Sequence, residues 1–202
     1  SRGEMGYPYI FFTDNANNGA ADVYKDKKLP IYASNLCTEI MLPSNHDWSF
    51  VCVLSSINVL HYDKWKDTDA VETMIYFLDA VITEFLEKLE VYKNSDDRDD
   101  QQTFLFMERA YNFSKENRAL GMGVLGWHSL LQSKMLPFDS QGAYDLNSEV
   151  FKNIKEHSNK ASKDLAEKFG EPELLKGYGR RNTTLNAVAP TTSSAFILGQ
   201  VS

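Results

Sequence analysis

Cysteine is scarce in this chain: only Cys37 and Cys52 occur among its 202 residues. Small secreted domains that are stapled by disulfides carry more cysteines than this, so the sequence favours a reducing compartment and we expect a cytoplasmic protein. A metal site is not expected, because neither cysteine has a second Cys or a His at ligand spacing and the four histidines are scattered. A disulfide between the two cysteines and two independent thiols both remain open.

Long apolar runs and an excess of positive charge are also missing. No run of about 18 apolar residues is present, so no membrane span is expected, and the start of the chain has no signal-peptide core. The chain holds 21 Lys and Arg against 28 Asp and Glu, a net charge of -7. A general nucleic-acid binder contacts phosphates through basic side chains, so nucleic acid is not an expected partner. A small anionic ligand held by backbone N–H groups is still compatible with this charge.

The rest of the composition, with 43% hydrophobic and 24% charged residues, is that of a soluble globular protein with a core. The sequence contains no internal repeat and no low-complexity linker, so residues 1–202 are treated as a single segment. It starts at Ser1 without an initiator methionine and stops at Ser202, and both ends look like cuts. At 202 residues the chain could form one domain or part of a larger one.

Hydrophobic periodicity predicts two long amphipathic helices. Apolar residues repeat three and four positions apart from Asp69 to about Tyr92 and from about Asn147 to Phe169, where Gly170 is a natural stop. The other expected elements are a helix at about 127–134, a solvated loop at 94–100, and strands at 9–13, 49–59 and 183–188. Strands that alternate with helices indicate an α/β fold with a mostly parallel sheet. So few strands for so many helices suit part of a larger barrel better than a closed domain.

Asn35, Cys37 and Glu39 form the first candidate site. In an extended or looped segment residues two apart point the same way, so the three side chains could face one site together. A thiol, a carboxylate and an amide together offer a hydrogen donor, a general base and an orienting hydrogen bond. The alternative interpretation is a lone buried cysteine beside a surface glutamate. Cys52 lies among apolar residues, where a free cysteine usually behaves as a small hydrophobic side chain.

Two further patterns concern phosphates. Residues 121–126 match GxGxxG, but no strong strand precedes them, so these glycines indicate close packing of the backbone rather than a dinucleotide site. Residues 189–196 read Ala-Pro-Thr-Thr-Ser-Ser-Ala-Phe after a predicted strand. Hydroxyls and backbone N–H groups at the start of a helix can hold a phosphate. A Ser/Thr-rich helix cap explains the same pattern.

The order and wording of five phrases give the chain a family resemblance. The phrases are Gly-Tyr-Pro-Tyr-Ile at 6–10, Ser-Asn-Leu-Cys-Thr-Glu-Ile at 34–40, Cys-Val-Leu-Ser-Ser-Ile-Asn at 52–58, Arg-Ala-Leu-Gly-Met-Gly-Val at 118–124, and Arg-Asn-Thr-Thr-Leu-Asn-Ala at 181–187 running into 189–194. Over nearly its whole length the chain resembles the large subunit of class I ribonucleotide reductases. The Pro-Thr-Thr-Ser-Ser wording is similar to that of phage-encoded members.

That resemblance implies a ten-stranded α/β barrel of two five-stranded halves, with a finger loop through its centre. This chain would supply the finger loop, about 33–45, and the second half of the barrel, with a phosphate-binding turn at about 189–195. By the family pattern, Cys37 becomes a thiyl radical that removes the ribose 3′ hydrogen, Glu39 takes the 3′-hydroxyl proton, and Asn35 hydrogen-bonds the sugar. Cys52 is one of two thiols that reduce the radical intermediate. The implied substrate-binding residues are Ser34, Thr191, Thr192, Ser193 and Ser194.

The resemblance also implies partners. The substrate is a ribonucleoside diphosphate, the radical comes from a metal-containing small subunit, and thioredoxin or glutaredoxin is the external reductant, with no cofactor bound in this chain. Because the expected cysteine partner of Cys52 would lie in the first half of the barrel, we expect activity only with the rest of the large subunit. Two alternatives stay open: a glycyl-radical enzyme on a similar barrel, and a non-catalytic fragment that acts only in assembly.

Overall fold

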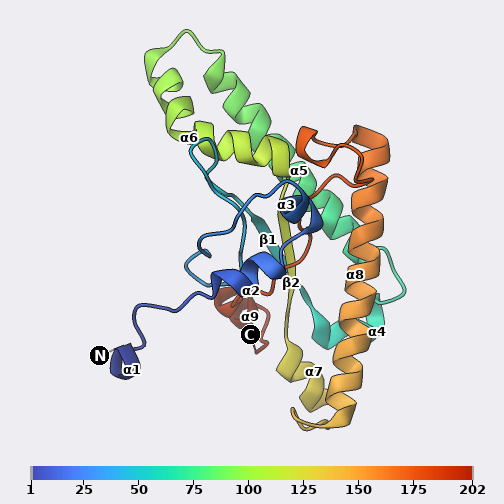
Figure 1. Ribbon diagram of the computed structural model, residues 1–202. Coiled ribbons are helices and arrows are strands. Elements are labelled where there is room, and N and C mark those ends of the chain that lie inside the picture. The colour runs from blue at the N-terminus through green and yellow to red at the C-terminus, as the bar shows by residue number, and fades with distance from the viewer. Residues whose placement is uncertain (1, 202) are drawn as a thin grey trace.

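The computed structural model describes residues 2–201, and its helices outnumber its strands (Figure 1). In chain order the elements are α1 (Arg2–Met5), α2 (Thr13–Asn18), α3 (Asp22–Asp26), β1 (Val53–Asn58), the 3-10 helix η1 (Val59–His61), α4 (Tyr62–Trp65), α5 (Ala70–Lys93), α6 (Arg98–Asn117), β2 (Leu120–Leu125), α7 (Trp127–Ser133), α8 (Gln141–Phe169), the 3-10 helix η2 (Glu173–Leu175) and α9 (Thr192–Ile197). Among the described residues, no helix has the length and apolar character needed to cross a membrane.

β1 and β2 form a parallel pair in the middle of the molecule, in register over six residue pairs. Residues 183–188 run along the other edge of β2. There the Leu120 N–H donates to the Thr184 carbonyl at 3.0 Å, and Asn186 forms a parallel bridge with Met122. Three extended segments from distant parts of the chain therefore lie side by side. The predicted α/β fold with a parallel sheet is confirmed.

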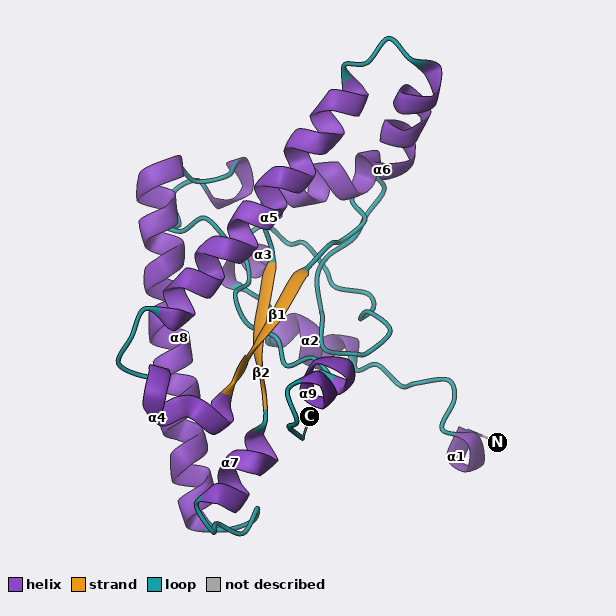
Figure 2. Cartoon of the chain, turned by 180° about the vertical axis from the view of Figure 1, so that it is seen from behind, coloured by secondary structure: helices purple, strands orange, loops and turns teal. Residues whose placement is uncertain are grey.

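The long helices α5 and α8 lie on one side of the strand pair, with α2 and α9 on the other (Figures 1 and 2). α5 contacts both strands and α8. Its apolar face is at most 2% exposed at Val71, Ile75, Leu78 and Ile82. These side chains share one cluster with residues of α8 and β2. Both predicted amphipathic helices are confirmed, and their apolar faces form the core that supports the strands.

α8 starts earlier than the periodicity predicts. It begins at Gln141 rather than at about 147, because the Ser140 hydroxyl caps its N-terminus by accepting from the Ala143 N–H at 3.2 Å. Its predicted end is confirmed: Phe169 is the last helical residue, and Gly170 follows with a φ of 82°, a conformation that favours glycine. The shorter helix expected at about 127–134 is α7.

The helix α6 is missing from the sequence prediction, which assigned a loop to 94–100 and no element to the residues after it. The loop extends only to Asp97, whose carboxylate accepts from the N–H groups of Asp99 at 2.8 Å and Asp100 at 3.2 Å. That run of acidic residues is therefore a helix start as well as a solvated segment. Few side chains of α6 are buried near this end, so its apolar period is weak.

The predicted strand at 9–13 is wrong. The segment is extended but joins no β-ladder, and α2 begins at Thr13. A strand needs a hydrogen-bonded neighbour, and none lies beside this segment in the described part of the chain. Its side chains stay largely exposed, Tyr9 to 57% and Phe12 to 68%. The strand expected at 49–59 shortens to β1.

The glycines of β2 let residues 183–188 lie directly against that strand. All six residues of β2 are buried. A Cβ on Gly123 would come within 2.2 Å of the Ala187 carbonyl oxygen, and one on Gly121 within 3.2 Å of the Ala187 Cβ. The interpretation of these glycines as close-packing residues is confirmed. The strand that contains them was not predicted, because glycine has a low β propensity.

Replacing Gly123 with alanine is expected to lower the free energy of unfolding by about 1–3 kcal/mol, because the added methyl group would press on a backbone oxygen. Chemical denaturation measures the loss. Gly142→Ala is a suitable control, since its nearest neighbour would be the flexible end of the Leu136 side chain at 2.9 Å and alanine is the better helix former. A Gly123→Ala chain as stable as the original would contradict the close packing.

Candidate active site

The segment that holds Cys37 is a tight turn between residues 35 and 40. The Asn35 N–H donates to the Ile40 carbonyl at 3.1 Å, and the Ile40 N–H donates to Asn35 Oδ1 at 3.0 Å. Thr38 takes a left-handed backbone conformation with a φ of 63°, which is unusual for a β-branched residue. Ile40 at the base of the turn is 5% exposed, whereas Cys37 near its tip is exposed. The turn thus presents the Cys37 thiol away from the core.

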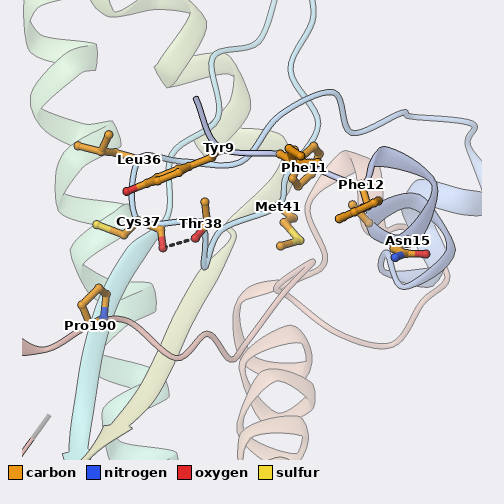
Figure 3. A pocket seen from close by; sticks show the side chains of 11 residues that line it. Tyr9, Phe11, Phe12, Asn15, Leu36, Cys37, Thr38, Met41 and Pro190 are labelled. Atoms are coloured by element: carbon orange, nitrogen blue, oxygen red, sulfur yellow. Dashed lines mark hydrogen bonds between the residues drawn. The ribbon is translucent and has the colours of Figure 1, made fainter. Parts of the chain in front are cut away.

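The Cys37 side chain lines an open pocket of about 1030 Å³ (Figure 3). Aromatic side chains of the N-terminal segment, among them Tyr9 and Phe12, form part of its wall, and Pro190 from the C-terminal part of the chain forms another. Pro190 immediately precedes the Thr/Ser cluster of the predicted phosphate-binding turn. The pocket therefore joins two of the site segments predicted from the sequence.

Glu39 faces a smaller cavity of about 180 Å³, whose walls include Cys52 and Asn186. The Oε2 atom of Glu39 is buried, and no described residue provides it with a hydrogen-bond partner. A buried carboxylate oxygen without a partner carries a desolvation cost. Glu39 therefore lines the same cavity as Cys52, and its buried Oε2 atom accepts no hydrogen bond from a described residue.

Residues 35–39 form a turn and not an extended segment. The left-handed Thr38 turns the backbone between Cys37 and Glu39, so these two residues line different cavities, and Met41 lines both. Alternation along the chain places residues on one face only in an extended segment, and the sequence carried no signal for a threonine with positive φ.

Cys52, immediately before β1, is a protonated thiol at neutral pH. Burial, and to a lesser degree the nearby Glu39 carboxylate, raise the pKa of Cys52 to about 12. Gly121 leaves room for the sulfur, since a Cβ there would lie 3.0 Å from Cys52 Sγ. Cys37 and Cys52 are both free thiols in the structure. Of the two possibilities that the sequence left open, the structure has independent thiols.

Alkylation with iodoacetamide should distinguish the two thiols. Because the thiolate is the reactive form, Cys52 should react slowly near neutral pH and faster as the pH rises toward its pKa of about 12. Glu39→Gln removes a negative charge beside this thiol, so it should lower the Cys52 pKa and speed alkylation at fixed pH, because a pKa that is lower by one gives about tenfold more thiolate. Mass spectrometry of one digest reads both sites, with the exposed Cys37 as internal control. An unchanged Cys52 rate in Glu39→Gln would contradict the coupling.

The Thr/Ser cluster starts α9, as the sequence predicts. Thr191 precedes the helix with a φ of 54°, and its side chain makes no capping hydrogen bond. Residues 192–194 form the first turn and are exposed. None of these four hydroxyls bonds to another described residue, so the interpretation as a side-chain cap is not supported. Ser34, at the base of the other turn, donates its hydroxyl to the Asn35 carbonyl at 3.0 Å.

A buried ion-pair network fixes the segment that leads toward α9, and sequence reasoning missed it. Asp79 of α5 is 3% exposed and accepts from Arg118 Nε at 2.8 Å, Arg181 Nε at 3.0 Å and Asn182 Nδ2 at 2.9 Å. Burial by itself raises the Asp79 pKa, but the contacts with Arg118, Arg181 and Asn182 outweigh it and hold the pKa below its usual value. Asp79 is therefore ionised and paired inside the protein.

The signal for this network was present in the sequence. Asp79 interrupts the apolar face of the predicted helix, next to Leu78, where an unpaired carboxylate would be costly. Arg118 and Arg181 are the first residues of two of the five phrases. The contacts join α5, the end of α6 and the segment before 183–188, so they hold β2 and its neighbour in place behind the site.

The chain matches the family model described as "Ribonucleotide reductase, barrel domain" over residues 1–177. It is 39% identical over 199 residues to a protein of Frog virus 3 named putative ribonucleoside-diphosphate reductase large subunit, covering 98% of this chain and 33% of that protein. It is 34% identical over 203 residues to the ribonucleoside-diphosphate reductase large subunit of Invertebrate iridescent virus 3, covering 100% of this chain and 30% of that protein.

A solved structure agrees with these relatives. The Actinobacillus ureae class Id ribonucleotide reductase alpha subunit superposes with a TM-score of 0.88 at 57% sequence identity, covering 98% of this chain and 36% of that chain. The chain thus spans about a third of the length of the relatives it matches. The small parallel sheet described above is part of a larger α/β barrel.

Proposed function

The chain belongs to the ribonucleotide reductase barrel family, and on that premise we propose that it supplies part of the site where ribonucleotides are reduced to deoxyribonucleotides. The observation that carries the proposal is the exposed Cys37 on a tight turn, facing a pocket that also reaches Pro190. Such a pocket lets one substrate touch the thiol and the Thr/Ser turn together. In this proposal the finger loop is about 33–45, and the phosphate-binding turn is about 189–195.

Cys37 starts the reaction as a thiyl radical. The sulfur takes the ribose 3′ hydrogen, so an S–H bond forms as the C–H bond breaks and the unpaired electron moves to C3′. The same S–H returns its hydrogen at the end, which restores the radical. A turn that exposes this thiol while anchoring its base at the buried Ile40 suits that task, because the reacting atoms need a defined geometry.

Glu39, Asn35 and Cys52 carry the later steps. Glu39 takes the proton of the 3′-hydroxyl, a general-base contribution worth about 10²–10⁴-fold, while Asn35 hydrogen-bonds the same edge of the sugar. The 2′-hydroxyl takes a proton from one of two thiols, Cys52 and a thiol from another part of the large subunit, and leaves as water. The two thiols then give C2′ a hydrogen atom and C3′ an electron and become a disulfide, while Glu39 returns its proton to the 3′ oxygen. Support for this division comes from the cavity that Glu39 shares with Cys52 and from the proton that Cys52 keeps at neutral pH.

The substrate is a ribonucleoside diphosphate. Its phosphates lie at the Thr/Ser turn, where the unbonded hydroxyls of Thr191, Thr192, Ser193 and Ser194 and the N–H groups at the start of α9 act as donors, with Ser34 beside the Cys37 turn. A metal-containing small subunit supplies the radical, and thioredoxin or glutaredoxin reduces the disulfide after each turnover. The free thiols suit the reducing cytoplasm.

Complementation tests this function. The chain is mixed with the separately expressed remainder of a large subunit and its small subunit, and deoxyribonucleotide formation is followed. We expect product only when all three are present, because this chain spans about a third of the relatives it matches. Parts that are shown to associate without any product would instead indicate an assembly piece without catalysis. Turnover by the chain alone would also contradict the proposed division of the site.

A further inference from the structure

Asn35 uses only one half of its amide inside the protein. Its Oδ1 atom accepts from the Ile40 N–H at 3.0 Å, whereas its Nδ2 group donates to no described residue. The Asn35 backbone completes the same connection, since its N–H donates to the Ile40 carbonyl at 3.1 Å and its carbonyl accepts from the Thr38 N–H at 3.2 Å. Residues 35 and 40 are thus joined from both sides at the neck of the turn.

The Ile40 N–H has no other partner among the described residues. Ile40 is 5% exposed and packs in a core cluster that includes Trp48 and Phe113. Removing the acceptor at Asn35 would therefore leave a buried donor unpaired, which is the costly way to lose a hydrogen bond. Thr38, within the turn, has a φ of 63°, a conformation that persists in a β-branched residue only where its surroundings impose it. The hydrogen bond between Ile40 and Asn35 helps to impose it.

We infer that Asn35 is a positioning residue: its Oδ1 atom closes the neck of the turn and holds Cys37 at the pocket, while Nδ2 remains available to the substrate. The inference deepens the proposed function and rests on it only for the role of Cys37. The two halves of the amide have separable tasks. Asn35→Asp keeps an oxygen that accepts from Ile40 but loses the donor, whereas Asn35→Ala loses both.

Hydrogen exchange in the full-length large subunit, resolved to single amides by mass spectrometry, tests the connection at pH 7. In the unchanged protein the Ile40 amide should exchange more slowly than the Glu39 amide, which donates to no described residue. Asn35→Ala should speed Ile40 exchange by about tenfold or more. Asn35→Asp should restore the protection. Asn45→Ala is the matched control, because Asn45 Oδ1 accepts from the Asp47 and Trp48 N–H groups in the next loop; it should expose those amides and leave Ile40 protected.

A kinetic readout separates positioning from general stability. Release of tritium from 3′-labelled substrate should fall about tenfold or more in kcat for Asn35→Ala, with KM changed less, because the phosphate-binding turn is untouched. Ile40 exchange that is unchanged in Asn35→Ala, or equally fast in Asn35→Asp, would overturn the inference. If Asn35→Ala unfolds as a whole, equal exchange of Ile40 and Glu39 in the unchanged protein overturns it instead. If another residue abstracts the hydrogen, the proposed function fails but the exchange results stay as expected. Failure of the proposed function and failure of the inference about Asn35 are therefore distinguishable.

Discussion

Replacing Asp79 with alanine should lower the free energy of unfolding by about 3–5 kcal/mol, because it leaves buried charges without their partner. The Arg118 side chain is 6% exposed and that of Arg181 14%, and Asp79 is the acidic partner of both. Asn182 also loses an acceptor for its Nδ2 group. A loss of this size is a large part of the stability of a typical domain.

Urea denaturation followed by tryptophan fluorescence measures this effect. Asp164→Ala is the control, since Asp164 pairs with Lys160 on the exposed surface of α8, and exposed pairs contribute about 0–1 kcal/mol. The folded-state pKa of Asp79 lies below its ordinary value of 3.8, so the stabilisation is present in full above that value and is lost as the pH falls through the folded-state pKa. The difference in the free energy of unfolding between the unchanged protein and Asp79→Ala should accordingly persist at neutral pH and shrink in acid. Equal losses for Asp79→Ala and Asp164→Ala would contradict the buried network.

The sequence predicts the parts of this fold that rest on local periodicity. α5 and α8 follow from apolar residues three and four positions apart, because one face of each helix is buried. The segment at 9–13 has the same β-type composition as a true strand, yet pairing is a long-range property and no strand pairs with it among residues 2–201. Composition alone therefore predicts where a strand is possible, and the partner decides whether it forms.

The candidate site is likewise only partly predictable from the sequence. The family resemblance predicts Cys37, Glu39 and Cys52 as the chemical groups, and both cysteines are free thiols in the structure. Their geometry depends on the left-handed Thr38, which no propensity scale assigns to a β-branched residue. It also depends on Gly121, which leaves space beside the Cys52 sulfur. The roles of these residues thus stay predictions from the sequence, whereas the separation of Cys37 from Glu39 is seen only in the structure.

Under the proposed function, Cys37→Ser in the full-length large subunit is expected to reduce turnover to below about a thousandth of the original rate, because removing the group that performs the chemistry costs orders of magnitude. Serine can neither hold the radical nor exchange hydrogen with the sugar at a useful rate, since its O–H bond is stronger than the thiol S–H bond. Cys37 is exposed, so the substitution should change the free energy of unfolding by no more than about 0.5 kcal/mol. Lost activity with an unchanged free energy of unfolding would show that Cys37 acts in the chemistry, whereas Asp79 acts in stability.

Cys52→Ser is the matched control for this prediction, because it removes the other thiol of the chain and leaves the first step possible. With 3′-tritiated substrate, Cys52→Ser should still release tritium to water while forming no deoxyribonucleotide, whereas Cys37→Ser should release none. Tritium release that survives in Cys37→Ser would assign hydrogen abstraction to another residue. Deoxyribonucleotide formation by Cys52→Ser at the original rate would show that the reducing thiols lie elsewhere, and Cys52 would then be a small apolar side chain that packs beside β1.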